Sequence, residues 1–120
     1  MKLQKDLTTP EQSMRLLALG VPADSADGFY SRESYRGGKW EYPKLFESDK
    51  DKVDFKSVYE GGVSMYLPLF TVGRLIEIFF KSSKYTYILL YPQFNQIDFL
   101  MSLFEEKIKA HKLDFSKLEE

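Results

Sequence analysis

The feature that most constrains the fold of this chain is an apolar stripe within residues 71–81. Apolar residues occupy the positions i, i+3, i+4, i+7 and i+8 of this segment, namely Val72, Leu75, Ile76, Phe79 and Phe80. This spacing places them on one face of an α-helix. Thr71 can cap the start of that helix, and Ser82-Ser83 ends it. We therefore expect four of these side chains to be almost fully buried in a core: Leu75, Ile76, Phe79 and Phe80.

A second helix is predicted over residues 9–19 by its end signals. Thr9 can cap it, Pro10 suits the first helical position, and Gln12 completes a capping box with Thr9. Gly20 follows as a left-handed helix stop. These signals predict a complete short helix.

A third helix is predicted over residues 95–112. Its expected buried face consists of Ile97, Leu100, Met101, Phe104 and Ile108. Asp98 in the first turn and several cations near the end match the helix dipole. The tail that follows, residues 114–120, is expected to be frayed.

Two segments predict β-structure. Residues 29–42 predict a hairpin, because the pair Gly37-Gly38 tolerates the positive φ of a two-residue turn. The register of that hairpin sets Tyr35 opposite Trp40 and Glu33 opposite Tyr42. Residues 85–91 are apolar and β-rich, and Pro92 stops them, so we expect a further strand there.

The order of these elements predicts an α+β fold. We expect a small antiparallel sheet of three to four strands packed against about three helices, in a single domain over residues 1–120. Residues 44–62 are dense in mixed charge and poor in apolar residues, and they predict a mobile loop.

Charge and composition exclude several function classes. The net charge is -1, so the chain lacks the overall basic excess of a generic nucleic-acid binder. Cysteine is absent, which excludes disulfides, zinc–thiolate sites and cysteine nucleophiles. No apolar run approaches the ~18 residues of a membrane helix. The N-terminus lacks the apolar core of a secretory signal. We expect a cytoplasmic protein without a membrane partner.

No catalytic residue, cofactor-binding residue or metal ligand is predicted. The chain has one histidine, His111, without a neighbouring ligand or a nucleophile motif. The acidic run 49–54 fails the calcium-loop pattern, because Val53 and Asp54 stand where an oxygen ligand and glycine are needed. The glycine pairs lack the spacing of phosphate loops. We therefore expect neither a cofactor nor enzymatic activity.

The predicted interaction surface lies on the hairpin. Aromatic residues Tyr30, Tyr35, Trp40 and Tyr42 interleave there with Arg32, Arg36 and Lys39. Aromatic and basic side chains together are enriched at binding hot spots. The candidate residues are Tyr35, Arg36, Lys39, Trp40 and Tyr42. The alternative is that one face of the hairpin belongs to the core, since aromatic strands usually contribute to it.

Three sequence blocks carry a resemblance to known proteins: TPEQSMRLLALGVPADSADGFY at 9–30, LPLFTVGRLIEIF at 67–79, and NQIDFLMSLFEEKIKAHKL at 95–113. Together they resemble a family of short uncharacterised proteins from gut-type bacterial genomes, phages and mobile elements. The second block matches the family pattern at Pro68, Phe70, Thr71, Val72, Leu75, Ile76 and Glu77, and departs from it at Leu69. The resemblance covers about half of the chain. It implies a cytoplasmic α+β domain and carries over no activity or catalytic residue.

Three function classes remain open. The expected one is a non-enzymatic interaction or accessory protein that binds a protein partner or itself. The second is a nucleic-acid-associated accessory protein, which a positive stripe over the hairpin would favour. The third is an enzyme that uses carboxylates and tyrosines, which a deep pocket with a pKa-shifted acid would favour.

Overall fold

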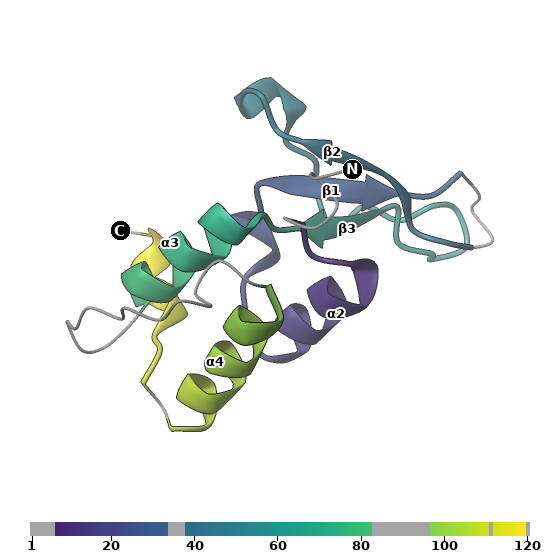
Figure 1. Cartoon of the computed structure of the whole chain (residues 1–120). Helices are drawn as coiled ribbons and strands as arrows, with labels where there is room; N and C mark the ends of the chain where they lie inside the picture. Colours follow the sequence, from purple (N-terminus) through teal and green to yellow (C-terminus); the bar gives the residue numbers. More distant parts are fainter. Residues whose placement is uncertain (1–6, 34–37, 83–96, 111, 120) are drawn as a thin grey trace.

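A three-stranded antiparallel sheet with the order β2-β1-β3 forms one layer of the fold (Figure 1). The structure is a computed structural model that describes residues 7–33, 38–82, 97–110 and 112–119. Its strands are β1 (Gly28–Ser31), β2 (Glu41–Leu45) and β3 (Tyr66–Leu69). Strand β1 pairs antiparallel with both neighbours, which confirms the predicted antiparallel sheet.

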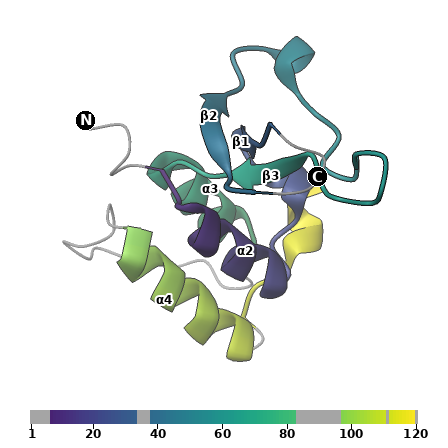
Figure 2. The ribbon, with the colours of Figure 1, turned by 90° about the vertical axis from the view of Figure 1, so that its right-hand side faces the viewer.

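The three α-helices of the described residues lie on the same side of the sheet (Figures 1 and 2). They are α2 (Pro10–Ala18), α3 (Val72–Ser82) and α4 (Ile97–Lys109). Short 3-10 helices are η1 (Ala23–Ser25), η2 (Asp49–Asp51) and η3 (Phe115–Glu119). The sheet and the helices that cover one side of it form a single α+β domain, as predicted.

The predicted end signals of α2 are present. Thr9 Oγ1 accepts a hydrogen bond from Gln12 N, and Gln12 Oε1 accepts one from Thr9 N. Gly20 has a φ of 104°, the left-handed conformation expected at the helix stop. The segment before α2 forms a bridge between Leu7 and Thr71, and thus ties α2 to the sheet region.

Helix α3 is buried through a different face from the predicted one. Leu75 and Phe79 are fully buried, as expected, but Phe80 is 43% exposed and Ile76 is only half-buried. Ile78 is fully buried in their place. The prediction was wrong for two positions because α3 is apolar around much of its circumference. The elements packed against it, α4 and η3, decide which side faces the core.

The main core joins α2, α3 and α4. Phe79 of α3 and Phe104 of α4 meet edge to face, with ring centroids 5.7 Å apart. The predicted buried face of α4 is confirmed at Ile97, Leu100, Met101 and Phe104, with Leu103 as an addition and Ile108 partly buried. Asn95, the predicted first residue of this helix, lies outside the described residues.

The sheet differs from the prediction in one strand. The third described strand is β3 at 66–69, which the sequence analysis assigned to no strand. Its four residues, with Pro68 among them, are too few to show an alternating pattern. The strand predicted at 85–91 lies outside the described residues.

The hairpin register also differs. Setting Glu33 opposite Tyr42 would place Ser31 opposite Lys44, whereas Ser31 pairs with Glu41. The register shifts between Phe29 and Ser31, and Tyr42 has a φ of 56°, a left-handed conformation that is unusual for a non-glycine residue. The described residues between the paired strands, 32–33 and 38–40, belong to neither strand, so the predicted pairing of Glu33 with Tyr42 is not formed.

Two predicted irregular segments contain local order. The first, 44–62, begins inside β2 and contains η2, and Phe46 N donates to Asp27 O. The second, 114–120, was predicted as a frayed tail, but it contains η3, whose Phe115 and Leu118 pack against the core beside α3. The residues that anchor these two segments lie far from them in the sequence. The mobility of 44–62 stays a prediction.

Candidate binding groove

A groove lies between the start of α2 and the first half of β2. We call it the Trp40 groove. It has a volume of about 670 Å³. Its lining residues are Leu7, Thr9, Pro10, Tyr30, Trp40, Glu41, Tyr42 and Pro43. Most of these residues present rings or aliphatic groups, so the groove is mainly apolar.

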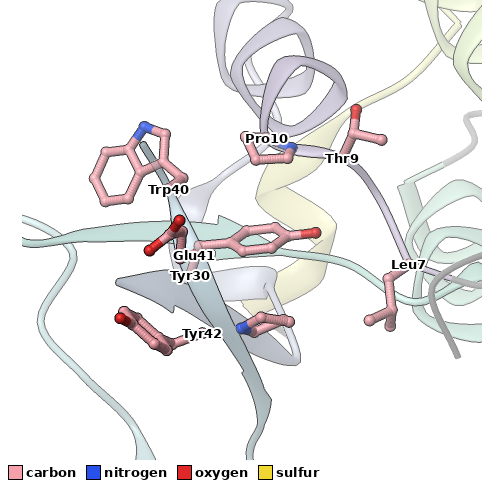
Figure 3. Close-up of a pocket in the computed structure, with 8 residues that line it drawn as sticks. Leu7, Thr9, Pro10, Tyr30, Trp40, Glu41 and Tyr42 are labelled. Atoms are coloured by element: carbon pink, nitrogen blue, oxygen red, sulfur yellow. The ribbon is translucent and has the colours of Figure 1, made fainter. Parts of the chain in front are cut away.

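Long-range hydrogen bonds fix the wall of the groove that precedes α2. Tyr30 OH donates to Thr8 O at 2.6 Å, which joins β1 to the segment that leads into α2. Thr8 Oγ1 accepts from Phe70 N at 3.1 Å, so the same segment is held to the end of β3. Figure 3 shows the Tyr30 ring between Trp40 and Pro10 above it and Tyr42 below it. The groove is therefore built on hydrogen-bonded backbone.

A second depression adjoins the first. We call it the Met14 depression; it has a volume of about 530 Å³. Its lining residues are Thr9, Pro10, Glu11, Met14, Lys39 and Trp40. It shares Thr9, Pro10 and Trp40 with the Trp40 groove, and Met14 is 46% exposed. The two hollows thus form one continuous surface on either side of Trp40 and Pro10.

One side of Trp40 packs against the rest of the fold. The side chain is half-buried and packs against a small cluster that contains Leu7, Tyr30 and Leu67. The guanidinium of Arg32 lies over its ring, with Cζ 3.5 Å from the ring centroid. Part of Trp40 is therefore structural, and the rest lines both hollows.

Tyr42 is the most exposed aromatic ring of the groove, with 50% of its surface accessible. Its hydroxyl donates to Glu33 Oε1 at 2.5 Å. This hydrogen bond, together with the nearby charges of Glu33 and Glu41, raises the pKa of Tyr42 to about 12. The hydroxyl is protonated at neutral pH and interacts with the carboxylates of Glu33 and Glu41.

The predicted site residues are partly brought together. Trp40 and Tyr42 line the Trp40 groove, and Lys39 lines the Met14 depression. Tyr35 and Arg36 lie outside the described residues. Glu33 and Tyr42 are joined through their side chains, although the strand register differs from the predicted one.

The sequence analysis missed the opposite wall. Its residues come from the segment before α2 and from α2 itself, namely Leu7, Thr9, Pro10, Glu11 and Met14. The capping box signalled where α2 begins, but nothing in the sequence indicated that this end of the helix faces the hairpin. Pro43 and Glu41 could have been included, because they flank Tyr42.

Other site types find little support in the described part of the chain. No group of three His, Asp or Glu side chains there is placed to hold a metal ion. None of the described helices is long and apolar enough to cross a membrane. His111 lies outside the described residues.

Comparisons of the chain with protein-family models, curated proteins and solved structures find no significant match. The class of the protein is therefore defined by its fold and its groove alone: a small α+β domain with an aromatic, mainly apolar groove at one edge of its sheet.

Proposed function

We propose that this protein is a non-enzymatic binding domain that docks a protein partner in the Trp40 groove. The observation that supports it is the set of rings gathered along one hollow, namely Pro10, Tyr30, Trp40, Tyr42 and Pro43. Rigid rings contribute large contact areas at a low cost in side-chain entropy. Tryptophan and tyrosine are also enriched among the residues that dominate binding energy.

The charges around the groove favour a protein partner over a nucleic acid. Glu41 lines the Trp40 groove, and Glu11 and Lys39 line the Met14 depression. A phosphate backbone would approach carboxylates here, whereas nucleic-acid sites present an excess of cations. Arg32 is stacked on Trp40. The lining thus carries no continuous positive stripe among the described residues.

The charged cavity at the start of α3 does not favour an enzyme. It has a volume of about 440 Å³, and its lining includes Asp27 and Arg74. Asp27 accepts two hydrogen bonds from Thr71, and Arg74 donates from Nε to Ser25 O. Both charged groups therefore hold backbone elements together instead of facing a substrate unpaired.

We further propose a cytoplasmic accessory role in a bacterial or mobile-element system. Support for this comes from the sequence resemblance of the three blocks, and the groove is compatible with it. The test of the binding function does not depend on this setting.

The binding function can be tested with an unbiased random-peptide display library. Trp40 is the only tryptophan of the chain, so its fluorescence reports on the groove directly. We expect selected peptides to shift Trp40 emission in the wild type. Replacing Met14 or Tyr42 with alanine should weaken binding about tenfold or more, as expected for residues that carry binding energy.

A matched control is Phe80→Ala. Phe80 is 43% exposed on α3 and lines neither hollow. This variant should bind selected peptides like the wild type. Selected peptides that leave Trp40 emission unchanged, or that bind the Met14 and Tyr42 variants normally, would contradict the proposed function.

A further inference from the structure

We propose that the partner presents an extended, proline-containing segment with a basic side chain to the Trp40 groove. This inference rests on the proposed binding function and adds the chemical class of the ligand. It is carried by three features of the groove: the rings that line it, the backbone groups that it lacks, and the carboxylates at its rim.

The rings favour a ligand with a polyproline II backbone. Trp40 and Tyr30 line the groove together with two prolines of the protein itself, Pro10 and Pro43. Grooves lined by aromatic rings accept the flat faces of ligand prolines. A polyproline II segment is already ordered before binding, so it loses little conformational entropy.

The missing backbone N–H of Pro43 disfavours the other kind of extended ligand, a β-strand added to the edge of the sheet. Strand β2 is an edge of the described sheet, and all five of its residues are exposed. Pro43 lies in the middle of this strand and has no N–H to donate to a neighbouring strand. A polyproline II ligand does not need such donors, because water satisfies its backbone.

The rim charges favour a basic side chain on the ligand. The Tyr42 hydroxyl donates to Glu33, and the nearby carboxylate of Glu41 also raises the pKa of Tyr42, so both carboxylates lie beside this hydroxyl at the rim. Within the described residues, neither Glu41 nor Glu11 forms an ion pair. The described cations here are Lys39, which lines the Met14 depression, and Arg32, which lies over Trp40, against the three carboxylates of Glu11, Glu33 and Glu41. An arginine or lysine on the ligand would complement this local excess of negative charge.

The continuous shape of the two hollows fits a ligand that extends past Trp40. The Trp40 groove and the Met14 depression share Pro10 and Trp40. Ligand prolines can contact the Trp40 groove while a basic residue reaches Glu41 or, on the other side, Glu11. The ligand would thus lie along the junction between α2 and β2.

Three synthetic peptides test the ligand class by Trp40 fluorescence titration. They are Pro-Pro-Pro-Arg-Pro-Pro, Pro-Pro-Pro-Glu-Pro-Pro and Gly-Ser-Gly-Arg-Gly-Ser. We expect the first to bind tightest. Losing the prolines should weaken binding about tenfold or more, because the ring contacts and the preordered backbone are both lost. The Arg→Glu exchange should weaken binding by about two- to fivefold at low salt, and by less at high salt.

Reversing the charge of Glu41 tests the contribution of the rim carboxylates separately from that of the rings. The Glu41→Lys variant should bind the arginine peptide more weakly and the glutamate peptide more tightly, which reverses the order seen in the wild type. Glu106→Gln is the matched control, since Glu106 is an exposed carboxylate on α4 outside both hollows. It should leave the order of the peptides unchanged.

The outcomes separate this inference from the proposed function. Library-selected peptides that depend on Met14 and Tyr42 but carry neither proline nor a basic residue would overturn the ligand class and leave the binding function standing. Quenching of Trp40 by an oligonucleotide, or by self-association at rising protein concentration, would overturn the ligand class in favour of another occupant. No response to any peptide, library-selected ones included, would overturn both.

Discussion

The carboxylate of Asp27 accepts hydrogen bonds from both donors of Thr71, its backbone N–H and its hydroxyl. Asp27 Oδ1 accepts from Thr71 N at 3.0 Å, and Oδ2 accepts from Thr71 Oγ1 at 2.6 Å. Thr71 Oγ1 in turn accepts from Arg74 N and caps α3. Asp27 directly precedes β1, so this pair joins the start of the central strand to the start of the helix that provides much of the core.

Removing this carboxylate should destabilise the fold without touching the groove. We expect Asp27→Ala to lower the free energy of unfolding by about 2 kcal/mol, because two charge-assisted hydrogen bonds are lost. The neighbouring exposed Asp24 is the matched control. Asp24→Ala should change the free energy of unfolding by less than about 0.5 kcal/mol. Urea unfolding measures both variants. Equal midpoints for the two would contradict the role given to Asp27.

Adjacent phenylalanines on α3 should differ sharply in their contributions to stability. Phe79 is fully buried against Phe104, and Phe80 is 43% exposed. Phe79→Ala should cost about 3–5 kcal/mol, the usual range for a buried phenylalanine. Phe80→Ala should cost about 1 kcal/mol or less. Chemical denaturation of the two variants gives the comparison. Similarly large losses for both would show that α3 packs through the face predicted from the sequence, which includes both rings.

The elements that could be predicted from sequence are those whose signals are local. The capping box at Thr9 and Gln12 lies within a few residues of the helix it starts, and the stripe of α4 repeats within a single segment. The buried face of α3 depended on distant partners, above all Phe115 and Leu118 of η3. Strand β3 likewise becomes recognisable only through its pairing with β1.

The candidate site could likewise be predicted only where its signals are local. The hairpin wall, with Trp40 and Tyr42, could be predicted because aromatic residues cluster within a few positions of each other. The α2 wall could not, because Pro10 reaches Trp40 only through the folding of the segment before α2 onto the sheet. The hydrogen bond between Tyr30 and Thr8 that fixes this approach spans 22 positions of sequence.

Two glycines should respond in opposite directions to substitution by alanine. A Cβ at Gly28 would lie 2.5 Å from Lys44 O of the neighbouring strand and 3.0 Å from the side chains of Leu45 and Leu69. Gly28→Ala should therefore cost about 3 kcal/mol through overpacking. A Cβ at Gly73 of α3 meets only Thr71 Oγ1, at 4.0 Å. Gly73→Ala should stabilise the protein by about 0.5–1 kcal/mol, because alanine favours the helix. Thermal unfolding tests the pair, and a neutral Gly28→Ala would show that β1 and β2 are not packed this closely.

The titration of Tyr42 tests the carboxylates at the rim of the groove. Its hydrogen bond to Glu33 raises its pKa from 10.0 to about 12, and burial raises the pKa of Tyr30 as well. The folded protein holds the phenolic proton more tightly than the unfolded chain does. The stabilisation from this hydrogen bond is therefore fully present below pH 10 and is lost as the pH rises through about 12.

Absorbance of the tyrosinate ion, followed against pH, measures this shift. In the wild type, one exposed tyrosine should ionise about two pH units above the usual tyrosine value, and Tyr42→Phe should remove that step. In Glu33→Ala the step should move back towards pH 10, because the largest cause of the shift is gone. Glu106→Ala, which changes a carboxylate on α4, should leave it in place. If the step in Glu33→Ala stayed near 12, the hydroxyl of Tyr42 would not be held by Glu33.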